Sequence, residues 1–556
     1  MEPVSQHHSD GKQIFRGSLH ALHSVMTPSI EGSEPGHDTS SPWGLPPRRL
    51  SFLAGRGWAV PLFIASSIYL YAELFYPSGV PILLRGDQTY FWVYAERILA
   101  GETVYRDFFQ FTPPGLDFLF VTFFHFFGEH IWVLNLAILF LGVALCLFCF
   151  CLACNFMSRS AAALAAAAFV VLLYGSRLDA THHWISSVMV LASGAVLYPD
   201  RSLKRLTLSG SLLGIASFFT QTAGMFGLAA LFAALVCDKP PRIDTVRKQI
   251  QLGAAFVLTF VTLMLPFVLT TGLRRIWFLL ITYPRRYVIY DHQFLLPSTT
   301  GWRTGHWPVA IGEVLFIYLS MLLIYPIALW QGWRTRRDVQ NGKRPIAVLV
   351  FLLTALSLLL EIVTRLNPIR IFSIAMPAII VTIAALDRTH RRRASLTIAA
   401  VLIAAVAVWQ VSSQHNNRYR LMYLPAGRAM VNSEDFEIFT WLQQHTHPGD
   451  FFFQAAWLNI YPPLKLRSPV FVDGLWPINV TRPEFVDLTV KQLDSKPVKY
   501  ILWAPRWQSP ATLGPSSEDH LDPFRHYLQS HYALIHIFSD GDEIWERRVQ
   551  SLGHSR

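Results

Sequence analysis

The feature that most constrains this chain is a long series of apolar runs separated by short polar segments. Eleven runs are long enough, or nearly long enough, to cross the hydrocarbon core of a bilayer, which takes about 20 helical residues. Of the 556 residues, 52% are hydrophobic and only 15% are charged, which is too apolar for a soluble protein. The sequence therefore predicts a polytopic α-helical membrane protein in contact with membrane lipid. The runs cover 57–76, 131–153, 160–174, 185–198, 206–220, 222–237, 250–272, 309–331, 346–363, 369–386 and 395–412.

The basic residues decide which loops lie on which side of the membrane. The segment Pro114 to Phe127 is short for a span and is typical of an interfacial or re-entrant helix. If this segment stays on the outer side without crossing the membrane, every dense basic cluster falls on the opposite side. The positive-inside rule assigns that side to the cytoplasm. If it crossed, each of those clusters would move to the outer face. We therefore expect three outer segments, at 78–130, 175–184 and 271–308.

The formal net charge of +11 does not indicate a nucleic-acid partner. The lysines and arginines are scattered in short clusters between apolar runs, and no basic aromatic module that would read bases is present. Four of the five cysteines lie close together in one apolar run. At about 100° per residue they point in different directions around one helix, so they cannot converge on a metal ion. These four are Cys146, Cys149, Cys151 and Cys154.

Composition divides the chain into three regions. Residues 1–56 are polar and rich in His, Ser, Gly and Pro, which predicts a disordered cytoplasmic tail. Residues 57–412 form the predicted membrane domain, and residues 413–556 form a predicted small α/β domain on the outer side. In this last region Ser433 is the candidate N-cap of a helix. The expected helices are 434–445, 483–494 and 523–530, and the expected strands are 451–455, 499–503 and 533–538.

The stretch from Leu84 to Asp117 concentrates charge in an otherwise apolar sequence, directly after the first predicted span. Charged and aromatic residues alternate in it, and a double proline forces an extended turn before the next helix. Its motifs are G-D-x-x-Y at 86–90, A-E-R-I-L-A-G at 95–101, Y-R-D at 105–107 and P-P-G at 113–115. In this order they resemble the first outer loop of GT-C-type membrane glycosyltransferases, the group that holds protein O-mannosyltransferases and lipid A aminoarabinose transferases.

The resemblance implies a fold, a reaction and a location. The fold is a GT-C-like helical membrane domain, and the enzyme is a hexosyl- or pentosyltransferase that takes its sugar from a polyprenyl phosphate. The resemblance also implies inversion at the anomeric carbon, no nucleotide-sugar site, and a bacterial inner membrane with the active site and the C-terminal domain facing the periplasm. The acceptor, which is a lipid, a glycan or a protein, and the identity of the sugar stay open.

Such a transfer needs a base for the acceptor's proton and cations for the leaving phosphate. Asp87 is the first carboxylate beyond the first span, where partial desolvation raises the pKa of a carboxyl group. In the resembling family the carboxylate at this place is the proposed catalytic base. That family often has Asp-Glu here, whereas this chain has Asp87-Gln88, so more depends on Asp87. The alternative is that Asp87 caps a helix beginning near Tyr90, which is itself a candidate substrate contact.

A second candidate carboxylate is Asp179, where the family commonly places an acidic residue that orients the acceptor. His182 and His183 beside it would allow contact with a phosphate or a divalent metal ion, although no metal ligand set is assigned. Asp107 is a further candidate contact together with Arg106, but a salt-bridged surface pair is the favoured interpretation of these two. Whether Glu96 and Arg97 are solvated or functional is left open.

Candidate phosphate ligands lie further along the chain. Arg285 and Arg286, in the motif Y-P-R-R-Y, occupy an outer segment where the positive-inside rule disfavours arginine. Guanidinium groups match phosphate oxygens in a bidentate way, which favours a lipid-linked phosphate as their partner. The alternative is that both snorkel to lipid headgroups. Tyr287 of the same motif is a candidate substrate contact, and Arg370 resembles a basic residue common at that place in these transferases.

Two other classes of function compete with the transferase. A transporter or flippase should carry buried charges near the middle of the membrane, in broken helices. Glu361 is almost the only acidic residue inside an apolar run, which counts against transport. A non-catalytic scaffold for envelope enzymes stays open.

Overall fold

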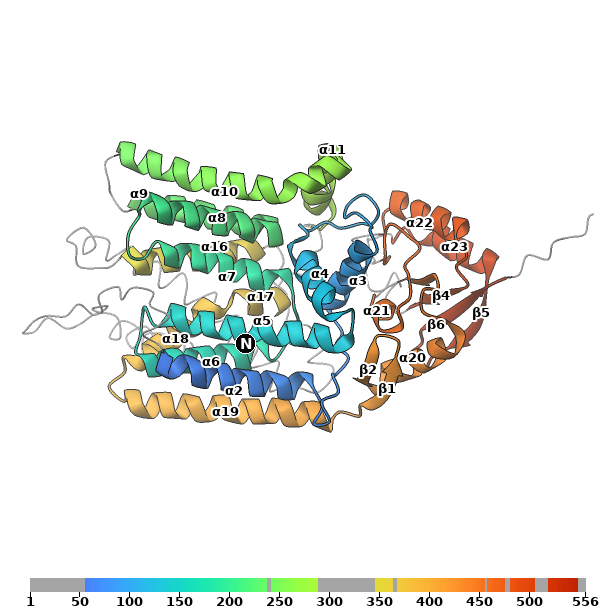
Figure 1. Cartoon of the computed structure of the whole chain (residues 1–556), viewed down its shortest axis with the longest axis horizontal. Coiled ribbons are helices and arrows are strands. Elements are labelled where there is room, and N and C mark those ends of the chain that lie inside the picture. The colour runs from blue at the N-terminus through green and yellow to red at the C-terminus, as the bar shows by residue number, and fades with distance from the viewer. Residues whose placement is uncertain are drawn as a thin grey trace, which may run out of the picture.

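The chain folds into a bundle of helices with a smaller domain at one end, which we call the outer domain after the side that the sequence predicts for it (Figure 1). The computed structural model describes residues 56–237, 242–288, 346–363, 368–455, 458–475, 481–505 and 519–548. The predicted tail, apart from residue 56, and the apolar run 309–331 lie outside these ranges.

Four helices of the bundle are long and apolar enough to cross a membrane by length and composition. They are α2 (Arg56–Leu74), α5 (Ile131–Ala153), α10 (Arg242–Thr271) and α19 (Arg392–Asn416). The remaining helices of the bundle are α6 (Arg159–Ala168) continued by η2 (Phe169–Tyr174), α7 (His182–Val196), α8 (Leu203–Phe219), α9 (Gln221–Cys237), α16 (Ile346–Ile362), α17 (Pro368–Ile374) and α18 (Met376–Asp387). Every predicted span within the described ranges is helical, which confirms the helical membrane fold. The predicted span 369–386 is divided between α17 and α18.

Glycines let neighbouring helices of the bundle approach closely. A Cβ atom added at Gly214 of α8 would lie 2.8 Å from the carbonyl oxygen of Phe256 in α10. At Gly210, one turn earlier, an added Cβ would collide with the carbonyl oxygen of Leu252. Small residues at such crossings are typical of helices in lipid, where close packing replaces the hydrophobic effect between helices. These two glycines therefore let α8 pack closely against α10.

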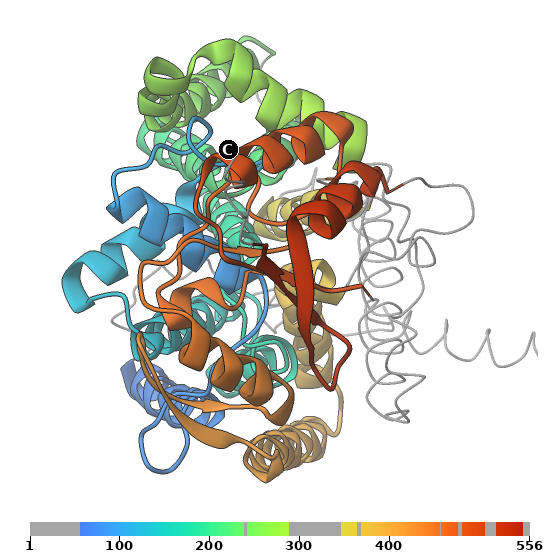
Figure 2. The same ribbon diagram turned by 90° about the vertical axis from the view of Figure 1, so that its right-hand side faces the viewer.

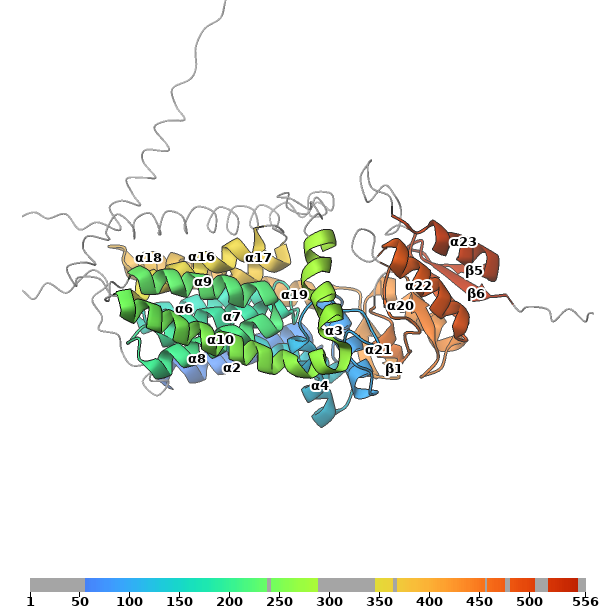
Figure 3. The same ribbon diagram turned by 90° about the horizontal axis from the view of Figure 1, so that it is seen from above.

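Two short helices lie between the bundle and the outer domain, namely α3 (Asp87–Leu99) and α4 (Gly115–Phe127) (Figures 1 and 3). α4 follows Pro113-Pro114 and has 13 residues, so it is too short to cross a bilayer. It packs against α3 and α5, and it exposes 73% of Phe126. This arrangement agrees with the interfacial helix that the sequence predicts.

The outer domain consists of a β-hairpin, a four-stranded sheet and several helices, and Figure 2 views it in front of the bundle. The hairpin pairs β1 (Arg420–Leu424) with β2 (Gly427–Val431). The sheet has the order β3-β4-β6-β5, in which β3 and β4 are parallel and the other pairs are antiparallel. Its strands are β3 (Phe452–Gln454), β4 (Tyr500–Trp503), β5 (Tyr532–Ile537) and β6 (Glu543–Arg547). The helices are α20 (Ser433–His445), α21 (Tyr461–Leu464), α22 (Pro483–Ser495) and α23 (Asp522–His531).

The structure confirms the expected helices and strands of this domain and corrects two details. Asn432, not Ser433, caps α20, because the Asn432 Oδ1 atom accepts a hydrogen bond from the Asp435 backbone at 2.8 Å. The sequence prediction also missed the hairpin and β6.

The outer segment predicted at 271–308 is helical as far as the structure describes it. It contains α11 (Leu273–Trp277), η3 (Phe278–Thr282) and η4 (Pro284–Val288). Its remaining residues, 289–308, lie outside the described ranges. Buried apolar side chains on one face explain the helical conformation: Leu279, Leu280 and Tyr283 pack in a core shared with residues of the outer domain.

Candidate functional site

Asp87 is the first residue of α3, at the place where the bundle meets the outer domain. Gly86 precedes it with φ +127°, a backbone conformation that favours glycine. No side-chain hydrogen bond caps α3, so the interpretation of Asp87 as a helix cap is wrong. Gln88 beside it is buried and donates a hydrogen bond to the carbonyl oxygen of Arg85 at 2.8 Å. The Asp87 carboxylate is therefore not committed to holding its own helix.

The structure brings Asp87, Asp179 and Arg370 together from three distant parts of the chain. Burial and the charge of Asp179 raise the pKa of Asp87 to about 6, and Arg370 opposes that rise. Asp179 is buried, and burial also raises its pKa, although it accepts a hydrogen bond from Trp184 Nε1 at 2.9 Å. A carboxylate with a pKa near the working pH suits general-base catalysis.

Arg370, in α17, is the cation at the centre of this cluster. Its charge acts on Asp87, on His182 and on Glu361. Glu361, at the outer end of α16, accepts a hydrogen bond from Thr222 Oγ1 at 2.8 Å. Sequence reasoning treated Glu361 only as an argument against transport, and its position beside Arg370 was missed.

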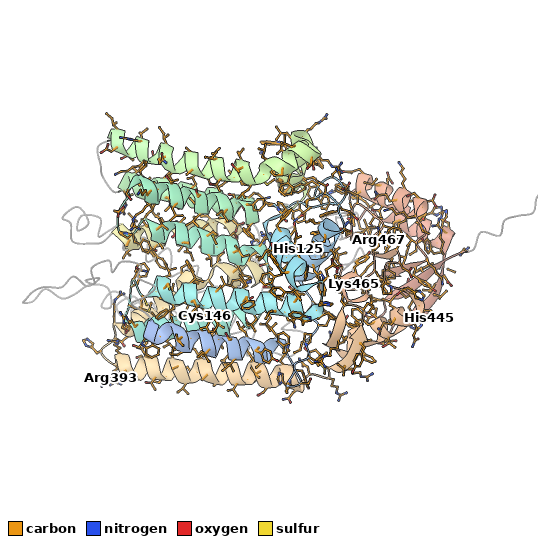
Figure 4. The ribbon with its side chains drawn as sticks, in the orientation of Figure 1. His125, Cys146, Arg393, His445, Lys465 and Arg467 are labelled. Carbon is orange, nitrogen blue, oxygen red and sulfur yellow. The ribbon has the colours of Figure 1, made fainter. Side chains whose placement is uncertain are left out.

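The two histidines lie at the start of α7, next to the cluster. His182 Nδ1 is 2.8 Å from Thr220 Oγ1, and the His182 ring packs edge-on against Phe91 with centroids 5.8 Å apart. The rings of His182 and His183 lie 4.1 Å apart. Within the described ranges, no group of three or more His, Cys, Asp or Glu residues is arranged to hold a metal ion. Cys146 lies inside the bundle on α5 (Figure 4).

Arg106 and Asp107 form the predicted surface ion pair. Arg106 Nη2 lies 2.8 Å from Asp107 Oδ2, and half of the Arg106 side chain is exposed. Hydrogen bonding to Arg106 lowers the pKa of Asp107, which makes Asp107 a poor base at neutral pH. Tyr90 is half-buried and lies three residues after Asp87 on α3, so both occupy one face of this helix.

The arginine motif forms part of the π-helix η4. Arg285 and Arg286 are exposed, and the charges that act on Asp87 are those of Asp179 and Arg370. The side chain of Tyr287 lies outside what the structure describes. A phosphate-binding role for Arg285 and Arg286, and a substrate contact for Tyr287, stay predictions.

Arg97 is buried and joins α3 to the outer domain, which answers the question of whether it is solvated. It forms ion pairs with Glu102, at 2.6 Å, and with the buried carboxylate of Asp473. It also donates hydrogen bonds to the carbonyl oxygens of Val470 and Asp107, both at 3.1 Å. The sequence offered no signal for this contact because Asp473 lies 376 residues further along the chain.

Glu96 makes a second connection between the same two parts. Lys465 of the outer domain reaches Glu129 at 2.6 Å and Glu96 at 3.5 Å. Figure 4 shows Lys465 at the boundary between the bundle and the outer domain. Backbone hydrogen bonds add to this contact, since the Phe109 amide donates to the carbonyl oxygen of Phe471 at 2.7 Å. The outer domain therefore contacts the charged stretch that carries Asp87 at Glu96, Arg97 and Phe109.

Solved structures with a similar fold were found, although no protein-family model matches the chain and no curated protein matches it in sequence. ArnT from Cupriavidus metallidurans in the apo state is similar with a TM-score of 0.57 and 14% identity, over 88% of this chain and 98% of that chain. The same protein bound to undecaprenyl phosphate gives a TM-score of 0.54 and 14% identity, over 89% of this chain and 98% of that chain. The arabinofuranosyltransferase AftD from Mycobacteria gives a TM-score of 0.48 and 12% identity, over 89% of this chain and 40% of that chain. The likeness to ArnT shows a GT-C-type fold.

Proposed function

We propose that this chain is a membrane glycosyltransferase that moves a sugar from a polyprenyl-phosphate donor to an acceptor outside the cytoplasm, with inversion. The observation that carries the proposal is the cluster of Asp87, Asp179 and Arg370. It combines a carboxyl group poised as a base with a cation suited to a leaving phosphate. The ArnT structure that holds undecaprenyl phosphate supports the class of donor.

The reaction is a single displacement at the anomeric carbon. Deprotonated Asp87 takes the proton of the acceptor while the acceptor atom bonds to the anomeric carbon from the face opposite the phosphate. The bond between that carbon and the phosphate oxygen breaks, and its electron pair stays on the phosphate. Arg370 stabilises this charge, and Arg285 and Arg286 are further candidate phosphate ligands. Asp179 orients the acceptor.

The experiment that tests the proposal follows a radiolabelled sugar on purified polyprenyl-phosphate donors. A transferase converts the donor to free polyprenyl phosphate and moves the label to an acceptor. A flippase leaves the donor chemically intact while moving it across the membrane of a vesicle, and a scaffold does neither. If hexose and pentose donors all stay intact with membrane extracts as the acceptor source, the proposed function is wrong.

The neighbours of Asp87 predict how activity changes with pH. Because Asp87 acts in its deprotonated form, kcat/KM should rise with pH and level off above about 6. Arg370 lowers the pKa of Asp87, so Arg370→Gln should move this limb to higher pH. Asp179 raises it, so Asp179→Asn should move the limb to lower pH.

Profiles normalised to their own plateau separate these shifts from any loss of rate. Arg106→Gln serves as the control, because the charge of Arg106 is not among those that act on Asp87. If the rise of kcat/KM with pH moved in the same direction in Arg370→Gln and Asp179→Asn, a group other than Asp87 would control it.

We propose that the outer domain lies in the periplasm, because the basic residues Arg391 to Arg393 lie at the start of α19, at the opposite end of the bundle (Figure 4). In a background in which the native cysteines are replaced, an impermeant thiol reagent should label His447→Cys in cells with a permeabilised outer membrane and an intact inner membrane. Both His447 and Arg393 are exposed, so accessibility to solvent does not bias the comparison. Labelling of Arg393→Cys instead would reverse the orientation and exclude a periplasmic site.

A further inference from the structure

A chain of buried hydrogen bonds runs behind the ring of His182. Ser186 Oγ donates to the carbonyl oxygen of His183 at 3.1 Å, and Thr220 Oγ1 donates to Ser186 Oγ at 3.0 Å. His182 Nδ1 lies 2.8 Å from Thr220 Oγ1. Ser186 and Thr220 are 1% and 4% exposed, so bulk water does not compete for these bonds.

The carbonyl group at one end fixes the direction of the whole chain. A carbonyl oxygen only accepts, and each hydroxyl group has a single proton to donate. The proton of Ser186 goes to the carbonyl, so the proton of Thr220 goes to Ser186. Thr220 Oγ1 can then only accept from the imidazole. His182 Nδ1 therefore carries a proton, which settles the tautomer of the neutral ring.

The surroundings keep this imidazole neutral. His182 lies in the outer segment 175–184, ahead of the apolar run 185–198. Burial and the positive charge of Arg370 lower the pKa of His182 to about 3. The ring also lies at the N-terminus of α7, where the helix dipole disfavours a further positive charge. A neutral ring with a proton on Nδ1 has an unprotonated Nε2, which is a hydrogen-bond acceptor.

The position of the ring places this acceptor next to the proposed base. The His182 ring packs against Phe91, which follows Asp87 by four residues on α3 and so lies on the same face of that helix. Arg370 acts on both Asp87 and His182. In the part of the chain that the structure describes, no residue donates a hydrogen bond to His182 Nε2, and the hydrogen bond of this ring is the one at Nδ1.

We propose that His182 Nε2 accepts a hydrogen bond from a substrate hydroxyl group, in a subsite beside Asp87 and Arg370. The proposal rests on the proposed function and deepens it, because sugars are rich in hydroxyl donors. A fixed acceptor discriminates against an analogue that lacks its hydroxyl, since the analogue cannot make this hydrogen bond. The hydroxyl belongs either to the sugar of the donor or to the acceptor, and the experiment below separates the two sources.

Two substitutions of His182 form a matched pair. The amide of His182→Asn ends near the position of Nδ1, so it can still donate to Thr220 but leaves nothing at the position of Nε2. The longer side chain of His182→Gln carries its amide oxygen about as far as Nε2. Loss of one hydrogen bond to a substrate costs about ten- to a hundredfold in affinity. We expect His182→Asn to lose substrate affinity by this factor and His182→Gln to lose less.

Binding measurements with undecaprenyl phosphate, with and without its sugar, identify the source of the hydroxyl. If it belongs to the donor sugar, His182→Asn binds the sugar-bearing donor about ten- to a hundredfold more weakly, while binding of undecaprenyl phosphate itself is unchanged. If it belongs to the acceptor, donor binding is unchanged and KM for the acceptor rises by that factor. The proposal would be overturned if His182→Asn weakened the binding of undecaprenyl phosphate equally with and without its sugar. It would also be overturned if neither donor affinity nor KM for the acceptor changed.

A spectroscopic measurement tests the tautomer without any substrate. In protein labelled with ¹⁵N-histidine, and with His182→Gln used to assign the signals, Nε2 of His182 should give the shift of an unprotonated nitrogen. Thr220→Val removes the hydroxyl that accepts from Nδ1, so it should abolish the preference for the tautomer with its proton on Nδ1. A protonated Nε2 in the wild type would overturn the proposal even if the enzyme is active. If the wild type releases no polyprenyl phosphate, the proposed function fails instead and the substrate assignment fails with it.

Discussion

Asp87→Asn is expected to lower turnover by about 10² to 10⁴-fold, the usual contribution of a general base. The substitution keeps the size of the side chain but cannot take a proton. The fold should survive it, because the Asp87 side chain does not cap α3 and its loss of charge also removes a repulsion with Asp179. Donor binding should therefore stay close to the wild-type value while release of free polyprenyl phosphate nearly stops.

The matched control for this prediction is Asp107→Asn. Asp107 belongs to the same outer segment, but it forms an exposed ion pair with Arg106 and its pKa is lowered, so it should retain substantial activity. Single-turnover assays with saturating donor compare the chemical step in the two variants. Near-normal turnover in Asp87→Asn would exclude it as the base and direct the search to Asp179.

Arg97→Met is expected to destabilise the protein by about 3–5 kcal/mol, the usual cost of removing one partner from a buried ion pair. Asp473 is 3% exposed, and without Arg97 its charge would be left in the interior beside Glu102. Thermal unfolding of the purified variant, followed by tryptophan fluorescence, should therefore occur at a clearly lower temperature than unfolding of the wild type.

The control is Arg106→Met, which breaks an exposed ion pair of a kind that contributes little to stability. Adding Asp473→Asn to Arg97→Met removes the uncompensated charge and should recover part of the lost stability. Equal melting temperatures for the two arginine variants would show that Arg97 and Asp473 do not interact in the folded protein.

The sequence predicted the architecture better than the grouping of the site residues. Long apolar runs are a local signal, so most of the described spans were found within a few residues of their observed ends, although α10 begins at Arg242, eight residues before the predicted run 250–272. Asp87, Asp179 and Arg370 were each picked out as candidates, but their closeness depends on how α3, α7 and α17 pack. Packing between segments so far apart leaves no trace in the spacing of residues.

The contacts and strands that the sequence did not predict were missed for equally specific reasons. Arg97 and Glu361 were assigned no role because their partners, Asp473 and Thr222, are distant in sequence. The hairpin β1-β2 turns at Pro425-Ala426, which lacks the Asn-Gly or Asp-Gly signal of a tight turn. Strand β6, Glu543–Arg547, carries three charged residues, so its alternation of apolar and polar positions is weak.

The strand order of the outer domain also fixes when its sheet becomes complete during synthesis. β6 lies between β4 and β5, although it follows both of them along the chain. Until residues 543–547 have left the ribosome, β4 and β5 each present an unpaired edge and the sheet cannot close. Arg97 cannot settle against a finished outer domain before then. The helices that carry Asp87 and Arg370 are thus synthesised before the strand that completes the sheet.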